Sequence, residues 1–315
     1  MTTGTLDLAY LESLRRFTDE RLGVEETFLT PELGGGMTIA VLTRPLGDAR
    51  ATGWVICHSY AFEQGNIQPM ETLLARRLAS AGYPVLRFHG QGYGDSELPV
   101  EDTGLASHLR DARDAVEVLR DVASVSHVAL AGPRLGGAVA AAVGADVGAT
   151  GLILWEPVAR GRPYIDGLLQ QRILAELTAP GRKPSIDDPL AILRAEGVAD
   201  LQGFTLTEKA YDEIRQLELL ERARGSVADA LVVQFARTER PRPDLVGLIE
   251  VLGERGGRVT LASIPPPPNE RPLGAPRFRG NGDGTKTDTQ VNLERELLSR
   301  TMAWVDAWST GKGDA

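Results

Sequence analysis

The chain has 315 residues, of which 42% are hydrophobic, and its formal net charge is -9. This length allows one large α/β domain with a substantial core, and the acidic charge argues against nucleic acid or an anionic membrane as the main partner. No apolar run approaches the roughly 18 residues of a membrane span, and the N-terminus lacks a secretory signal pattern, so we expect a cytoplasmic protein. The single cysteine, Cys57, excludes an internal disulfide and a cysteine-based zinc cluster, and we expect neither metal nor cofactor.

The N-terminal part of the chain predicts a helix followed by a hairpin. Residues 6–22 have helical apolar spacing, and two β-prone runs, 25–30 and 37–43, flank the glycine triplet Gly34-Gly35-Gly36. Glycines between two such runs are typical of a turn, so we expect the runs to pair as an antiparallel hairpin.

Strands and helices alternate in the next part of the chain. Buried strands are predicted at 53–57, 84–88, 127–131 and 151–155. Helices are predicted at 70–81, 105–122 and 135–147. This alternation indicates a mostly parallel sheet with helices on both faces. No G-x-G-x-x-G motif follows the first parallel strand, which argues against dinucleotide binding.

The region between residues 160 and 225 predicts an all-helical insertion. Its helices are expected at 164–177, 189–196 and 207–223. The core then consists of residues 1–159 and 226–315, with further strands at 230–235 and 258–264 and helices at 243–254 and 291–308. A Pro/Gly-rich loop at 265–289 precedes the last helix.

The segment Gly132-Pro133-Arg134-Leu135-Gly136 joins an apolar strand to an Ala-rich helix. It resembles the nucleophile elbow of α/β-hydrolases, where G-x-S-x-G presents a serine above the sheet. Arginine is protonated at any physiological pH and cannot attack a carbonyl. The pattern therefore predicts the architecture of a hydrolase without its nucleophile.

The other two members of a Ser-His-Asp triad are also hard to place. The acid would follow the strand at 230–235, where Glu239 and Asp244 are the candidates. The base would follow the strand at 258–264, but no histidine occurs after His127. Since this fold needs Ser, acid and His in that chain order, ordinary ester or amide hydrolysis is not expected.

Arg134 should project at a helix N-terminus, where a planar guanidinium suits a carboxylate or phosphate. A buried unpaired charge is costly, so some anionic partner is expected. That partner is either a protein carboxylate, with Glu156 and Glu63 as candidates, or a ligand anion, and both could serve in turn.

Two further loops carry polar residues near the expected site. His89 lies in the glycine-rich turn at 88–96, which contains Tyr93, and His58 precedes Ser59 and Tyr60 after the strand at 53–57. Each histidine either shapes its loop or faces a ligand. We take Arg134, Leu135, Ser59, Tyr60, His58 and Tyr93 as candidate ligand-binding residues.

Residues 25–175 resemble α/β-hydrolases related to the serine aminopeptidase group. The resemblance is carried by residues 57–63, the strand at 84–88, Gly94-Asp95-Ser96, the elbow and residues 154–164. These segments resemble most closely the branch named exosortase A system-associated hydrolase 2, whose elbow also has arginine. The resemblance implies an α/β-hydrolase fold with a lid at the insertion, and it transfers no catalytic triad.

Three functions are consistent with these residues. A degenerate hydrolase could bind a small anionic or acyl molecule or serve as an accessory protein in a biosynthetic pathway. A repurposed lyase, cyclase or transferase could use Arg134 and His58 as preorganised donors, with His89, Glu63 or Glu156 as the acid/base group. An interaction protein, either a homo-oligomer or the partner of a pathway protein, is the third.

Overall fold

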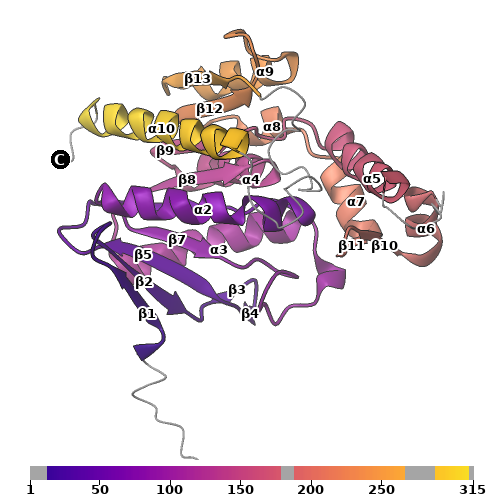
Figure 1. The fold of residues 1–315 in the computed structure, drawn as a ribbon, viewed down its shortest axis with the longest axis horizontal. Helices are drawn as coiled ribbons and strands as arrows, with labels where there is room; N and C mark the ends of the chain where they lie inside the picture. The colour runs from indigo at the N-terminus through magenta and orange to yellow at the C-terminus, as the bar shows by residue number, and fades with distance from the viewer. Residues whose placement is uncertain (1–12, 179–187, 267–287, 312–315) are drawn as a thin grey trace, which may run out of the picture.

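The structure is a computed structural model that describes residues 13–178, 188–266 and 288–311. Its central strands are β1 Arg16–Asp19, β2 Val24–Leu29, β5 Ala40–Pro45, β6 Thr52–Ile56, β7 Val85–Phe88, β8 His127–Pro133, β9 Gly151–Trp155, β12 Asp229–Phe235 and β13 Val259–Ile264. They form one sheet in the order β1-β2-β5-β7-β6-β8-β9-β12-β13 (Figure 1). The strands from β7 to β13 are parallel, and β1, β2 and β5 form an antiparallel edge.

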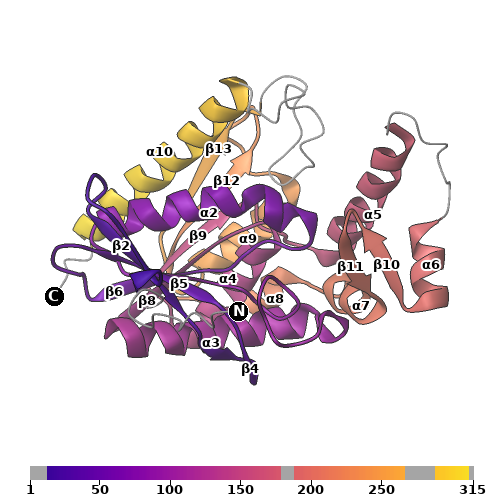
Figure 2. The ribbon, with the colours of Figure 1, turned by 60° about the horizontal axis from the view of Figure 1, so that its bottom comes forward.

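Helices cover both faces of this sheet. They are α2 Phe62–Ser80, α3 Leu105–Ala123, α4 Leu135–Val147, α8 Leu219–Ala223, α9 Pro243–Gly253 and α10 Asp288–Gly311. α2 and α10 pack on one face, and α3, α4, α8 and α9 pack on the other (Figures 1 and 2). All five residues of β6 are buried, as expected for a strand covered on both sides. The predicted mostly parallel sheet with helices on both faces is confirmed.

The segment between β9 and β12 projects from the side of the sheet (Figure 2). It contains α5 Gly161–Thr178, α6 Pro189–Glu196, β10 Val198–Leu201, β11 Phe204–Thr207 and α7 Glu208–Arg215, and then α8 packs back on α4. The prediction that this insertion is all helical is wrong, because β10 and β11 form an antiparallel hairpin. Gln202 and Gly203 both have positive φ, which suits a tight hairpin turn.

The physical reason for this error is the shortness of the two strands. Four-residue strands with two inward residues, such as Ala199 and Leu201, carry too little alternation to stand out between helices. The single helix predicted at 207–223 is also wrong, since α7 ends at Arg215 and α8 begins at Leu219.

The N-terminal prediction needs correction as well. Residues 16–19 form β1 rather than part of a helix, and the amides of Arg21 and Leu22 donate to Asp19 Oδ1 in the turn that follows. Pairing with β2 is a tertiary contact that the local spacing does not encode. The first half of the predicted helix lies outside the described residues.

The predicted pairing of the two β-prone runs is confirmed by β2 and β5. The glycine triplet, however, turns a smaller hairpin between them, formed by β3 Glu32–Leu33 and β4 Gly36–Met37.

Helix α2 begins eight residues earlier than predicted, at Phe62, and contains Pro69. Proline removes one backbone donor, so the pattern favoured a helix start beyond it. The consequence is that Glu63 lies in the first turn of a helix. Most of the loop predicted at 265–289 lies outside the described residues. Within the described ranges, no helix is both long and apolar enough to cross a membrane.

Candidate functional site

Arg134 lies at the sharp turn between β8 and α4. Its backbone has φ 54° and ψ -122°, a conformation that non-glycine residues rarely adopt. The two flanking glycines allow the turn: a Cβ on Gly132 would lie 2.3 Å from the carbonyl oxygen of Gly136, and one on Gly136 would lie 2.2 Å from that of Cys57. The strand and helix approach so closely that only glycine fits at both positions.

The guanidinium of Arg134 lies between two carboxylates of the protein. Nε donates to Glu63 Oε1 at 3.0 Å, and Nη1 donates to the carbonyl oxygen of Glu156 at 3.3 Å and lies 3.7 Å from Glu156 Oε2. The Tyr164 hydroxyl donates to Glu63 Oε2 at 2.6 Å, and its ring centroid lies 5.5 Å from Arg134 Cζ. Burial lowers the pKa of Arg134, but Glu63, Tyr164 and Glu156 outweigh burial and raise that pKa. Arg134 is therefore a permanent cation.

A second arginine extends these contacts. Arg242 Nη1 donates to both oxygens of Glu156, at 2.9 and 2.7 Å, while its Nε and Nη2 bind Asp244. The amide of Phe235 also donates to Glu156 Oε1. Asp244, one of the two candidate triad acids, thus binds an arginine. We call Tyr164, Glu63, Arg134, Glu156 and Arg242 the elbow network.

Backbone strain collects in the same place. Ala61, Arg134 and Glu156 have φ values of 50°, 54° and 51°, and they follow the neighbouring strands β6, β8 and β9. Since such conformations cost on the order of 1–3 kcal/mol each, the surrounding contacts must hold them. For Ala61 one such contact is visible, because its amide donates to the Tyr93 hydroxyl at 3.0 Å.

Both ring nitrogens of His58 are engaged by the backbone. The amide of Gly90 donates to Nε2 at 3.3 Å, so Nδ1 carries the proton and donates to the carbonyl oxygen of Ser59 at 2.8 Å. Burial lowers the pKa of His58 to about 3, so it is neutral. These contacts are what a loop-shaping role requires.

Three other candidate binding residues lie in the loop after β6 and at the start of α4. The Ser59 hydroxyl donates to the carbonyl oxygen of Pro133 at 3.3 Å, and the Tyr60 ring lies 5.8 Å from the His108 ring. Leu135 opens α4, where the first amides have no intrahelical acceptor. Ligand binding by these residues stays a prediction.

His89 lies apart from the elbow network. The Asp95 amide donates to its Nδ1 at 3.4 Å, and the Thr38 hydroxyl donates to its carbonyl oxygen. Burial lowers the pKa of His89. Its suggested acid/base role stays a prediction, and the structure brings it near Glu71 instead of Arg134.

Glu71, on α2, is a buried carboxyl that the sequence did not single out. Together with Arg87, His58 and His89 it lines a small cavity of about 30 Å³, room for one water molecule. Burial raises the pKa of Glu71 to about 8, against the opposing effects of the Ser59 backbone and Arg87. Glu71 Oε1 is buried and has no hydrogen-bond partner in the part of the chain that the structure describes. In the sequence, Glu71 lies within a stretch of helical apolar spacing and belongs to no motif, so no local pattern could have identified it.

Tyr164 and Arg242 were also missed as site residues. Tyr164 lies in the segment 154–164 that carries the family resemblance, but no local pattern assigned it a partner 101 positions away. Within the described residues, no group of three or more His, Cys, Asp or Glu side chains could hold a metal ion.

No family model and no curated protein matches the sequence. Several solved structures do match. Est1E from Butyrivibrio proteoclasticus, solved with ferulic acid bound, has a TM-score of 0.56 at 15% identity, covering 88% of this chain and 99% of that one. The Pyrococcus furiosus esterase has a TM-score of 0.59 at 14% identity, covering 93% and 94%. Proline iminopeptidase from Mycobacterium smegmatis has a TM-score of 0.57 at 14% identity, covering 91% and 100%. At such identities the likeness concerns the fold alone.

Proposed function

The chain has the α/β-hydrolase fold, and we propose that it is not a serine hydrolase but binds a small acyl or anionic molecule over the elbow. The observation that carries this proposal is the ion pairing of Arg134, which occupies the elbow in the strained backbone conformation and binds Glu63 and Glu156. A protonated guanidinium held in this way has no lone pair with which to attack a substrate.

Arg134 is the member of the network best placed to meet a guest. Its side chain is 17% exposed, against 3% for Glu63 and 2% for Glu156. Its Nε and Nη1 donate within the protein, while Nη2 has no hydrogen-bond partner among the described residues. An oxygen of the guest would accept from Nη2.

The charge of the elbow network favours a weakly charged guest. Arg134 and Arg242 balance Glu63 and Glu156, and Asp244 adds a third carboxylate. The site has no surplus of positive charge for a multiply charged anion. A neutral acyl carbonyl or a single carboxylate suits it better.

We extend the proposal to the surrounding protein. Residues 160–225 would act as a lid on the core formed by 1–159 and 226–315, with Tyr164 tying its first helix to Glu63. The role would be that of a cytoplasmic accessory protein in a biosynthetic pathway.

A repurposed enzyme is the second candidate, and one contact favours it. The Tyr164 hydroxyl lies 2.6 Å from Glu63, and burial together with the Glu63 charge raises the pKa of Tyr164. A tyrosine paired with a carboxylate can donate a proton, and Arg134 could stabilise negative charge beside it.

The test uses the full chain with two kinds of probe. We expect no hydrolysis of p-nitrophenyl butyrate above the buffer rate. We expect octanoate and octanamide to bind saturably by calorimetry, with Arg134→Gln weakening both about ten-fold and Arg113→Gln, on exposed α3 surface, weakening neither.

Thermal unfolding of each variant separates lost binding from lost folding, and Arg134→Lys, which keeps the charge without the planar fork, provides a milder change. Ester turnover that disappears in Arg134→Gln would overturn the proposal and favour the repurposed enzyme. If neither octanoate nor octanamide bound, the proposal that the elbow binds an acyl molecule would be wrong.

A further inference from the structure

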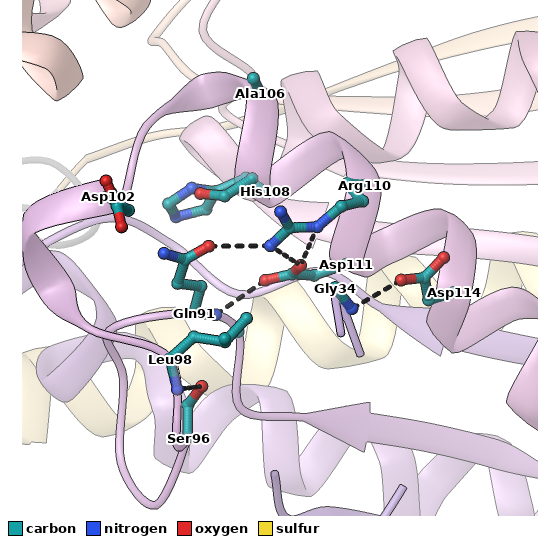
Figure 3. A network of polar contacts seen from close by, with 12 residues as sticks. Gly34, Gln91, Ser96, Leu98, Asp102, Ala106, His108, Arg110, Asp111 and Asp114 are labelled. Carbon is teal, nitrogen blue, oxygen red and sulfur yellow. Dashed lines mark hydrogen bonds and ion pairs between the residues drawn. The ribbon is translucent and has the colours of Figure 1, made fainter. Parts of the chain in front are cut away.

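A second cleft, of about 410 Å³, shares no residue with the elbow network. Gly34, the loop 91–99, Asp102, the first turns of α3 and Lys209 of α7 line it, and Figure 3 shows most of its polar groups. Ligand pockets usually measure about 300–1,000 Å³, so this cleft is large enough for a small metabolite.

Arg110 is held in a fixed position at one side of the cleft. Its Nε and Nη2 donate to Asp111 Oδ1 at 3.1 and 2.9 Å, and Nη2 also donates to Gln91 Oε1 at 2.8 Å (Figure 3). Asp111 is buried, and its Oδ2 accepts a hydrogen bond from the backbone amide of Gln91 at 2.7 Å. Nη1 of Arg110 has no hydrogen-bond partner in the described part of the chain. A guanidinium fixed on one edge and free on the other is prepared for a carboxylate.

Charges of both signs line the rest of the cleft. Lys209 Nζ donates to the main-chain oxygen of Asp102 at 3.0 Å. Among residues 13–178, 188–266 and 288–311, neither the Asp102 carboxylate nor the Lys209 ammonium has an ion-pair partner. The lining residues therefore carry two cations, Arg110 and Lys209, and one anion, Asp102, while the buried Asp111 behind the cleft pairs with Arg110. This balance does not favour a simple anion, which would leave Asp102 repelled and unpaired.

We propose that this cleft binds a small zwitterion, a free amino acid with an apolar side chain. The carboxylate accepts from Arg110 Nη1, the ammonium pairs with Asp102, and the side chain lies on Leu98 and Pro99. This inference does not depend on the function proposed for the elbow, because the two sites have no residue in common.

The experiment compares three probes of one shape with the full chain. L-leucine carries both charges, 4-methylpentanoate lacks the ammonium, and 3-methylbutylamine lacks the carboxylate. In calorimetric titrations at matched ionic strength, L-leucine should bind saturably. Each of the other two should bind about ten-fold more weakly, because each loses one charge-assisted contact.

Variants locate the binding. Arg110→Gln and Asp102→Asn should each weaken L-leucine binding about ten-fold. Arg113→Gln, one turn further along α3 and outside the cleft, should bind L-leucine as the parent does. Arg110→Gln leaves buried Asp111 without its cation and could unfold. Asp102 is exposed, so Asp102→Asn tests the proposal on a folded chain.

Three results would overturn it. The first is the absence of saturable L-leucine binding. The second is equally tight binding of 4-methylpentanoate or of 3-methylbutylamine, which would indicate a site for one charge only. The third is unchanged binding in Asp102→Asn.

Discussion

The elbow network and the Glu71 cavity show two ways of burying a carboxyl group next to the strand ends of one sheet. Glu63 and Glu156 lie against guanidinium groups at hydrogen-bond distance. The cation near Glu71 is Arg87, and its guanidinium binds Glu26 at 3.1 Å rather than Glu71. Without a bound cation, burial dominates and raises the pKa of Glu71 to about 8, so its carboxyl is mostly protonated at neutral pH. A guanidinium at hydrogen-bond distance is what separates the buried Glu63 and Glu156 from the buried Glu71.

The largest expected effect comes from breaking the elbow pair. Glu63→Leu removes the carboxylate and leaves the mostly buried Arg134 with only Glu156, which Arg242 already binds. Removing one member of a buried pair costs about 3–5 kcal/mol, and we expect a loss near 3 kcal/mol in the free energy of unfolding measured with urea.

The double variant Glu63→Leu/Arg134→Met provides the control. It replaces both charges with apolar groups and should recover most of that loss, since no charge is left unpaired. A single variant that loses less than about 1 kcal/mol, or a double variant that loses as much as the single one, would contradict the pairing argument.

The next effect concerns the pH dependence of Glu71. Its folded pKa of about 8 lies above the ordinary value of 4.5, so the folded state binds more protons between these values and stability falls as the pH rises. His58 acts in the opposite sense at lower pH. Its folded pKa of about 3 lies below 6.5, so its contribution is complete above pH 6.5 and is lost as the pH falls toward 3.

The window from pH 6.5 to 8 therefore isolates Glu71. Between pH 6.5 and pH 8, the free energy of unfolding of Glu71→Gln should rise relative to that of the parent by on the order of 1 kcal/mol. Urea unfolding at three pH values measures this change. Parallel profiles for the two proteins would show that Glu71 does not bind an extra proton in the folded state.

The comparison also shows which parts of the molecule could be predicted from sequence. The runs that became β6, β8 and β9 are mostly apolar and bounded by turn residues, and their assignment as buried strands follows from that. The β10-β11 hairpin has no such run. Its strands are stabilised by packing with neighbouring helices, which local alternation does not record.

The site was predictable only where one residue carried the signal. Arg134 in the elbow pattern indicated that a carboxylate should be near, and Glu63 and Glu156 were named as candidates. That Glu63 binds it follows from the early start of α2, which Pro69 concealed. Arg242 lies 86 positions from Glu156, and no local pattern links residues so far apart.

A smaller effect is expected from Tyr164. Tyr164→Phe removes the hydrogen bond to Glu63 but keeps the ring near Arg134, so we expect a loss of about 1 kcal/mol in the free energy of unfolding. Tyr211→Phe is the matched control, because its hydroxyl donates to the more exposed Asp166 at 3.1 Å. Equal losses in the two variants would show that the Glu63 contact has no special weight.

The smallest effect is expected at the protein surface, from another pair of a guanidinium and a carboxylate. Arg113 Nε donates to Asp146 Oδ2 at 3.0 Å, but the side chains are 43% and 49% exposed. Solvent screens such a pair, so Arg113→Gln should change the free energy of unfolding by about 0.5 kcal/mol or less, and added salt should reduce even that. Urea unfolding at low and high ionic strength measures both values. If Arg113→Gln cost as much as Glu63→Leu, burial could not be the reason that the elbow pair matters, and the contrast between paired and unpaired buried carboxyls would lose its basis.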